Sequence, residues 1–193
     1  MKYAFDLDDT LSDTATVINE YAVKFDKEFL NGDGKMKEID NSVDYYYFAE
    51  ALNWNKDNIR EFFKQYYLEI IEKVKVKPLV AETIDKLKKE NNKIYIITAR
   101  RKREENEIEN ITKKWLDKNK IYYDELYINA KEKFSLVNEL SIDYFIDDSY
   151  KNCKEVLEKT KAQVFMIETE FNKQIKDNKI KIIKNINQIL KEI

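Results

Sequence analysis

Two pairs of carboxylates in this chain directly follow apolar residues, and both pairs could hold a metal ion. Asp6 and Asp8 lie two residues apart at the end of one apolar run, and Asp147 and Asp148 follow another at 144–146. Side chains alternate along an extended strand, so Asp6 and Asp8 can face the same side. Carboxylates this close repel one another unless a cation lies between them, and a hard divalent ion such as Mg²⁺ takes oxygen ligands. Aspartates also cap helices and turns, so the pattern alone leaves both interpretations open.

Two further segments carry groups that could hold an anion. Thr98 and Ala99 follow an apolar run, where a hydroxyl and free backbone N–H groups can form an anion-binding nest. A threonine that caps the next helix explains this pattern equally well, and Arg100 beside it could touch a substrate. Lys131 and Lys133 open a helix-like segment, where solvated surface charge is the ordinary explanation of a lysine.

The composition excludes several other kinds of site. The 193 residues include no histidine, which rules out a Ser-His-Asp triad and the HExxH zinc site. The single cysteine, Cys153, excludes an internal disulfide and a thiolate zinc cluster, and it is interpreted as an apolar filler. Two glycines cannot supply a Walker A loop or a GxGxxG turn. Catalysis would therefore need carboxylates, lysines, hydroxyls and a metal ion.

Charge and hydropathy limit the partners. The net charge of −2 gives no reason to expect a nucleic-acid polymer or an anionic membrane as partner. No apolar stretch approaches the ~18 residues of a membrane-spanning helix, and the first residues do not resemble a signal peptide. We therefore expect a cytoplasmic protein that acts on a small molecule, and its oligomeric state stays open.

Short apolar runs alternate with amphipathic segments from Lys93 onward. The first strand is expected at 2–7. Runs rich in β-branched and aromatic residues predict further strands at 94–97, 126–128, 144–146 and 164–167. Helices are expected near 102–119, 131–140 and 150–160, and a weaker run at 180–183 leads into a last helix. The corner at Asn91-Asn92 is expected to use a left-handed asparagine. This alternation predicts an α/β fold with a Rossmann-like parallel sheet.

Residues 13–77 interrupt the alternation. Helices are expected there near 14–30, 43–52 and 55–75, and Pro78 restricts the residue before it and marks the return to the sheet. We interpret 13–77 as a small helical cap, or lid, inserted into an α/β core formed by 1–12 and 78–193. Four aromatic residues of this cap could stack on a nucleobase, although packing in the cap is the simpler interpretation of each: Tyr45, Tyr46, Tyr47 and Trp54.

Taken in order, the motifs FDLDDT, ITAR, KEK and FIDDS resemble those of the haloacid dehalogenase superfamily of phosphohydrolases. That family has DxDxT at the first strand, then a threonine, a lysine and a pair of aspartates. Lys133 lies at the interval before Asp147 that is expected of the family's lysine, so it is preferred to Lys131. The stretches FDLDDTLSDT and KPLVAETIDKLKKENNKIYIITAR look most like the cytosolic type C 5′(3′)-deoxyribonucleotidases and their bacterial relatives.

The resemblance implies a role for each motif. Asp6 would be the nucleophile that forms an aspartyl-phosphate, and Asp8 the acid that protonates the leaving oxygen and then activates water. Mg²⁺ would lie on the Asp6 carboxylate, the Asp8 main-chain carbonyl and Asp148, with Asp147 as a second ligand or an outer support.

The same resemblance implies that Thr98 and the Ala99 N–H hold the phosphate and that Lys133 neutralises it. The expected activity is Mg²⁺-dependent hydrolysis of a phosphomonoester, preferably a nucleoside or deoxynucleoside monophosphate. A sugar phosphate or another small metabolite is the alternative substrate. A signalling module that keeps its phospho-aspartate is a further alternative, and Asp8 discriminates against it because such a carrier needs no leaving-group acid.

Overall fold

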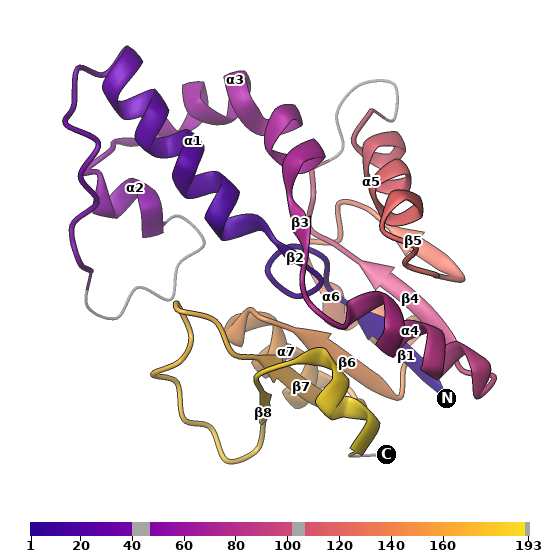
Figure 1. The fold of residues 1–193 in the computed structure, drawn as a ribbon. Coiled ribbons are helices and arrows are strands. Elements are labelled where there is room, and N and C mark those ends of the chain that lie inside the picture. Colours follow the sequence, from indigo (N-terminus) through magenta and orange to yellow (C-terminus); the bar gives the residue numbers. More distant parts are fainter. Residues whose placement is uncertain (40–46, 102–106, 192–193) are drawn as a thin grey trace. The chain divides into compact units, whose positions relative to one another are not determined.

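A six-stranded sheet organises most of the chain in the computed structural model, which describes residues 1–39, 47–101 and 107–191. All of its strand pairs are parallel, in the order β5-β4-β1-β6-β7-β8 (Figure 1). The strands are β1 (Lys2–Phe5), β4 (Lys93–Ile97), β5 (Glu125–Tyr127), β6 (Tyr144–Asp147), β7 (Gln163–Ile167) and β8 (Lys181–Ile183). The predicted α/β fold with a parallel sheet is confirmed.

The first strand lies in the middle of this sheet. On one side of β1, Lys2 pairs with Lys93 of β4, and on the other, Tyr3 pairs with Tyr144 of β6. After Lys2, the residues of β1 are buried on both faces, as the apolar run Tyr3-Ala4-Phe5 predicts. The carboxyl ends of β1, β4 and β6 therefore lie side by side, and the motif residues that follow these strands meet at one edge of the sheet.

Helices cover the sheet in this part of the chain. They are α4 (Val80–Lys89), α5 (Glu107–Lys118), α6 (Lys133–Glu139), α7 (Tyr150–Lys159) and the 3₁₀ helix η2 (Ile186–Lys191). Val137 of α6 and Val156 of α7 pack in one apolar core with Ala4 of β1, Tyr95 of β4 and Phe145 of β6, whose side chains point to the same face of the sheet. In Figure 1, α6 and α7 lie behind the sheet and α4 and η2 in front of it.

Asparagine supplies much of the left-handed backbone in a chain with two glycines. Asn91 has φ +61° between α4 and β4, which confirms the expected corner, and the Asn92 side chain donates to the Leu87 carbonyl. Asn31, Asn53 and Asn129 also have positive φ. Asparagine tolerates this conformation better than most side chains because its short amide can hydrogen-bond locally.

Several predicted elements differ in detail. The expected last helix is a 3₁₀ helix, and β1 ends at Phe5 instead of residue 7. The starts of the helices expected at 43 and 102 lie outside the described residues, within which α2 begins at Tyr47 and α5 at Glu107. Two strands of two residues each, β2 (Ser12–Asp13) and β3 (Lys75–Val76), pair with one another. Two residues are too few to show a strand periodicity in the sequence.

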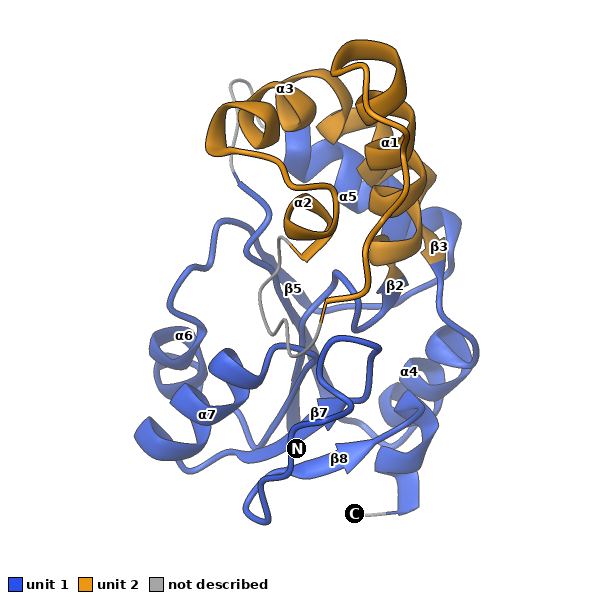
Figure 2. Ribbon diagram, turned by 90° about the vertical axis from the view of Figure 1, so that its left-hand side faces the viewer, with its two compact units in different colours: residues 1–12, 76–193 blue, residues 13–75 orange. Residues whose placement is uncertain are grey.

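The chain divides into two compact units, residues 1–12 with 76–193 and residues 13–75 (Figure 2). The second unit is helical, with α1 (Thr14–Phe29), α2 (Tyr47–Ala51) and α3 (Lys56–Lys73). Asn55 caps α3 in a reciprocal pair with Asn58, which fixes where this helix begins. The unit has its own aromatic core, because Phe62 packs against both Phe25 and Phe48 and all three rings are buried.

Trp54 belongs to this helical core. Its ring centroid lies 5.3 Å from that of Phe25 and 5.4 Å from that of Phe62. Its indole N–H donates to Asp26 Oδ1 at 2.8 Å, and Asp26 also accepts the backbone N–H of Gly34. A side chain at Gly32 would overlap the same carboxylate. Trp54 is therefore held as a structural residue, while Tyr45 and Tyr46 lie outside the described residues.

We expect Trp54→Phe to lower the free energy of unfolding without changing hydrolysis of p-nitrophenyl phosphate. The variant keeps an aromatic ring but loses a hydrogen bond to a buried carboxylate, which is worth about 1.5–3 kcal/mol. Chemical denaturation of the purified variant measures the change. A variant as stable as the wild type that selectively loses activity on nucleotides would instead place Trp54 on a nucleobase.

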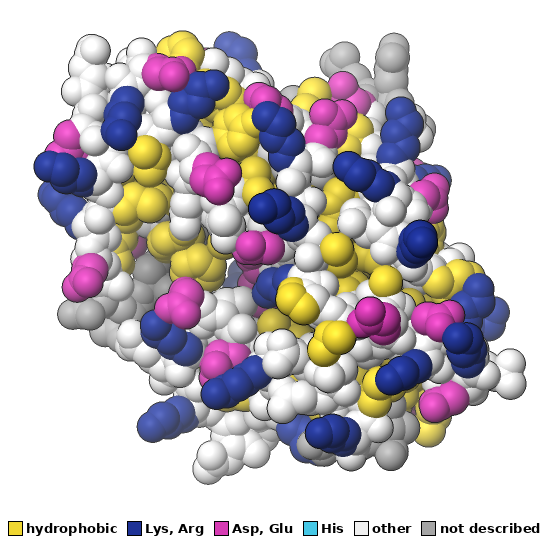
Figure 3. All heavy atoms as spheres, viewed as in Figure 1, with side chains coloured by type: hydrophobic (Ala, Val, Ile, Leu, Met, Phe, Trp, Pro, Cys, Tyr) yellow, Lys and Arg dark blue, Asp and Glu magenta, His cyan; other side chains and the backbone are white. Residues whose placement is uncertain are grey.

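The surface mixes both signs of charge. Figure 3 shows Lys and Arg interspersed with Asp and Glu over the face in view, in keeping with the net charge of −2. Within the described residues, every helix is too short or too polar to cross a bilayer.

Candidate active site

The chain turns back on itself directly after β1. The Asp6 N–H donates to the Ile146 carbonyl at 2.8 Å and so continues the pairing between β1 and β6. The Leu7 carbonyl then accepts the backbone N–H groups of Leu11 and Ser12 and the Ser12 hydroxyl. These three hydrogen bonds to the Leu7 carbonyl close the loop and fix the path of the backbone on both sides of Asp8.

Lys133 joins two of the motif carboxylates. Its ammonium pairs with Asp6 and lies 2.7 Å from Asp147 Oδ2, and all three side chains are buried. Lys133 is the first residue of α6, whereas Lys131 is exposed two residues earlier. The structure thus places Lys133, and not Lys131, beside the expected nucleophile.

Burial shapes the electrostatics of this group. Burial, together with the neighbouring carboxylates, raises the pKa of Asp6 to about 7 even though Lys133 acts in the opposite direction. Burial opposes the charge of Lys133, but Asp147 and Asp6 outweigh it and raise the pKa of this lysine. Burial and the nearby Asp147 also raise the pKa of Asp148 well above its usual range. Negative charge is therefore in excess here, and a cation would stabilise it.

Asp147 has hydrogen-bond partners at both oxygens. Besides the bond from Lys133, Oδ1 accepts the Ser149 N–H at 2.8 Å, and the Asn152 amide lies 3.1 Å from Oδ2. A carboxylate with this many donors is well suited to fixing the position of Lys133. The arrangement is compatible with both roles expected of Asp147, second metal ligand and outer support.

Asp148 is positioned by two residues to which the sequence analysis gave no role. The Thr10 hydroxyl donates to Asp148 Oδ1 at 3.2 Å. The buried Asn172 amide donates to the main-chain carbonyls of Asp148 and Ile167, at 2.8 and 2.7 Å. Thr10 is the threonine of the DxDxT motif, so the sequence could have indicated that it belongs to the site. Nothing around Asn172 in the sequence points to its contact with Asp148.

The carboxylates can hold a hard metal ion. One oxygen from each of Asp6, Asp147 and Asp148 lies within 4.8 Å of the others. All the donors are oxygens, the kind that Mg²⁺ takes, and the excess negative charge described above points the same way. The residues present therefore fit the divalent ion that the motif series implies.

Thr98 and Ala99 lie at the carboxyl end of β4. Thr98 is buried, its N–H donates to the Tyr127 carbonyl, and its hydroxyl accepts the Arg100 N–H at 3.2 Å. Ala99 is exposed. This segment thus lies beside the loop after β1, at the edge where the other motifs meet.

Arg100 contacts Asp8, the carboxylate expected to be the general acid. Arg100 Nε donates to Asp8 Oδ2 at 2.9 Å, and Nη2 to Asp8 Oδ1 at 2.8 Å. Sequence reasoning suggested only that Arg100 could touch a substrate. A contact between residues so far apart in the chain has no local signature.

Cys153 lies in the apolar core beneath this edge. It is completely buried, and burial raises the pKa of its thiol well above the usual range. A thiol kept protonated is a poor nucleophile, in keeping with its interpretation as an apolar filler.

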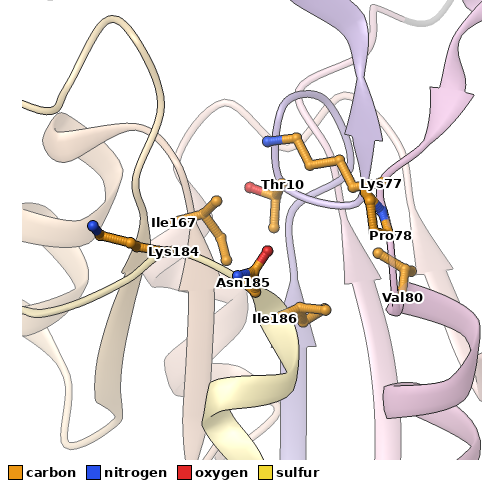
Figure 4. A pocket seen from close by; sticks show the side chains of 8 residues that line it. All are labelled: Thr10, Lys77, Pro78, Val80, Ile167, Lys184, Asn185 and Ile186. Atoms are coloured by element: carbon orange, nitrogen blue, oxygen red, sulfur yellow. The ribbon is translucent and has the colours of Figure 1, made fainter.

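A small cavity lies beside the loop after β1. It measures about 40 Å³ and is lined by Thr10, Lys77, Pro78, Val80, Ile167, Lys184, Asn185 and Ile186 (Figure 4). Such a space suits a water molecule and not a nucleoside. The Lys77 ammonium donates to the Asp9 carbonyl, so this region braces the loop that carries Asp8.

Comparison with known proteins agrees with this geometry. The model of the family described as "Haloacid dehalogenase-like hydrolase" matches residues 3–118, which include the DxDxT loop and the Thr98 segment. The chain belongs to the haloacid dehalogenase-like hydrolases. This confirms the resemblance at the level of the superfamily.

Two curated relatives of this haloacid dehalogenase-like hydrolase match it over nearly its whole length. One, from Bacillus cereus, is named "Putative nucleotidase" and is 25% identical, with 100% of this chain and 99% of that protein covered. The other, from Bacillus subtilis, is named "Putative nucleotidase YqfW" and is 23% identical, with 96% and 89% covered.

A solved structure shares the fold of this haloacid dehalogenase-like hydrolase. The haloacid dehalogenase-like family protein SP0104 from Streptococcus pneumoniae superposes with a TM-score of 0.68 at 15% identity, with 99% of this chain and 97% of that chain covered. Family membership, the motif series and the curated relatives together support hydrolysis of a phosphomonoester.

Proposed function

We propose that this hydrolase removes the phosphate from a nucleoside or deoxynucleoside monophosphate in a Mg²⁺-dependent reaction that passes through a phosphorylated Asp6. One observation carries the proposal: Asp6, Lys133, Asp147 and Asp148 are brought together at the carboxyl edge of the sheet. A carboxylate can approach a phosphate dianion only where positive charge cancels their repulsion. The buried Lys133 provides one such charge.

The proposed reaction has two halves. In the first, an Asp6 oxygen attacks phosphorus, the bond to the leaving oxygen breaks, and Asp8 donates a proton to that oxygen. In the second, Asp8 takes a proton from water, the water oxygen attacks phosphorus, and the bond to Asp6 breaks. Two steps through a covalent intermediate replace one difficult displacement.

The other motif residues bind the phosphate and the ion. Thr98 and the Ala99 N–H hold the phosphate oxygens, and Lys133 neutralises them. Asp6, the main-chain carbonyl of Asp8 and Asp148 would hold Mg²⁺, while Asp147 keeps Lys133 in place. The bound ion would offset the negative charge that gathers on the phosphate during transfer.

The nucleotide part of the proposal is supported by the names of the two Bacillus relatives and by the resemblance to the type C 5′(3′)-deoxyribonucleotidases. The helical unit 13–75 follows the Asp6 loop in the chain, and we propose that it acts as the lid. A lid would exclude water until the leaving group has departed.

The first test concerns the metal. We expect hydrolysis of p-nitrophenyl phosphate to stop when EDTA is added and to return when Mg²⁺ is restored in excess. Without the ion, the buried carboxylates and the substrate phosphate repel one another. Full activity in the chelator would overturn the proposed metal site.

The second test concerns the substrate. Phosphate release is measured over nucleoside 5′- and 3′-monophosphates, their deoxy forms, sugar phosphates and p-nitrophenyl phosphate. We expect the highest kcat/KM for a nucleoside monophosphate. A preference for a sugar phosphate would favour the metabolite-phosphatase alternative. A stable phospho-Asp6 with no release from any substrate would favour the signalling module.

A further inference from the structure

We propose that Arg100 is a positioning residue that holds the Asp8 carboxylate in the orientation needed to deliver a proton to the leaving oxygen. The inference rests on the proposed function, which makes Asp8 the general acid. It goes further by assigning to the arginine of the ITAR segment an action on Asp8 in place of a contact with the substrate.

The contact between the two side chains is bidentate. Both oxygens of Asp8 accept from the same guanidinium, at 2.9 Å from Nε and 2.8 Å from Nη2. Two parallel hydrogen bonds fix both the position and the plane of a carboxylate, which a single contact cannot do. The Arg100 side chain is 1% exposed and that of Asp8 14%, so solvent screens the pair only weakly.

Arg100 is itself held from several directions. Nη1 donates to the buried Thr112 hydroxyl of α5 at 3.1 Å. Its N–H donates to Thr98 Oγ1, and its carbonyl accepts the Asn129 N–H at 3.0 Å. The guanidinium is therefore anchored to α5 and to the end of β4 independently of Asp8.

This anchoring matters because Asp8 lies in the loop after β1, where its backbone forms an isolated bridge with Ser12 that does not orient its side chain. A catalytic group must be held close to its productive geometry, and small displacements are costly in rate. Arg100 stays protonated throughout, so it orients Asp8 without exchanging a proton itself. The proton that Asp8 gives and takes is carried on the second lone pair of an oxygen that already accepts from Arg100. A lysine would keep the charge but could not reproduce the planar fork.

Comparing esters with different leaving groups distinguishes a positioning role of Arg100 from a general structural role. An alkoxide such as that of a nucleoside needs its proton as the bond to phosphorus breaks, whereas p-nitrophenolate leaves readily without one. Loss of the orientation of Asp8 should therefore slow phosphoryl transfer to Asp6 much more for alkyl phosphates than for p-nitrophenyl phosphate. Hydrolysis of phospho-Asp6 also uses Asp8 and is the same for both esters, so the comparison is made on kcat/KM, which reports only the first half of the reaction.

The experiment compares Arg100→Met and Arg100→Lys with the control Arg101→Met, which removes an exposed arginine from the next position. kcat and KM are measured for p-nitrophenyl phosphate and for the preferred alkyl phosphate of the substrate panel. For Arg100→Met we expect kcat/KM on the alkyl ester to fall about 10- to 100-fold, part of the ~10²–10⁴-fold contribution of a general acid. kcat/KM for p-nitrophenyl phosphate should change little. Arg100→Lys should behave like Arg100→Met, and Arg101→Met like the wild type.

Thr112→Val provides a second variant in case Arg100→Met does not fold. It leaves both contacts to Asp8 but removes the hydrogen bond that anchors Nη1. The rate on the alkyl ester relative to that on p-nitrophenyl phosphate should therefore fall, but by less than in Arg100→Met. In an Asp8→Asn background, Arg100→Met should cause no further loss, because the residue it orients is already disabled.

Several results would overturn the inference. Equal losses of kcat/KM on both esters would mean a structural role or a contact with the phosphate that both esters share. Full activity of Arg100→Lys would mean that charge alone matters. If Asp8→Asn itself fails to discriminate between the esters, the acid role in the proposed function is wrong. If Asp8→Asn discriminates and Arg100→Met does not, only the role of Arg100 is wrong.

Discussion

Asp6→Asn is expected to abolish turnover and to prevent any covalent trapping of phosphate. An amide oxygen in the same place is a far weaker nucleophile, while asparagine preserves the size of the side chain. Asp8→Asn should still bind beryllofluoride, with kcat lower by about 10²–10⁴-fold, the usual weight of a general acid. Steady-state rates and mass spectrometry of acid-quenched enzyme measure the two effects.

A matched control for these variants is Asp85→Asn, which changes an exposed carboxylate of α4 and should leave both measurements unchanged. If the Asp6 variant kept its turnover, the nucleophile would have to lie elsewhere. An unchanged kcat in the Asp8 variant would remove the acid role and favour a phosphate-carrying module.

Lys133→Met should lose activity and much of its stability together. Removing one partner of a buried ion pair leaves the charges of Asp6 and Asp147 uncompensated, a change that costs about 3–5 kcal/mol. The phosphate also loses a positive charge directly beside the nucleophile. Chemical denaturation gives the first effect and p-nitrophenyl phosphate hydrolysis the second.

Lys131→Met is the control, because the same change two residues earlier removes an exposed lysine. The double variant Lys133→Met/Asp147→Asn should recover part of the lost stability but none of the activity, since it removes a stranded buried charge without restoring the lysine. A Lys133→Met variant as stable and active as Lys131→Met would show that the buried cluster has neither role.

The sequence could predict the parallel sheet because its strands are short apolar runs, and because strand ends meet at one edge whatever the loops do. It could therefore predict that Asp6, Thr98 and Asp147 would be neighbours. These residues lie at the carboxyl ends of β1, β4 and β6, which are neighbours in the sheet. Their catalytic and binding roles remain proposals.

The supporting contacts could not be predicted in the same way. The Asn172 amide reaches the carbonyl of Asp148 from a loop after β7, and Arg100 reaches Asp8 across the edge of the sheet. Such contacts depend on loop paths and on the reach of long side chains, which leave no periodic pattern. Trp54 is a similar case, since its bond to Asp26 and its packing against Phe25 and Phe62 mark it as structural, and none of these contacts can be read from the sequence.

The central place of β1 has a consequence for how the protein is made. β1 is synthesised before the strands with which it pairs, because its partners Lys93 and Tyr144 lie much later in the chain. The strand Lys2–Phe5 must therefore wait unpaired while the helices of 13–75, which need only near neighbours, can form. Chain closure around β1 becomes a late event in folding, and nascent chains that stop before β6 expose an aggregation-prone strand. Asp6, the proposed nucleophile, is thus synthesised long before the strands that complete its surroundings.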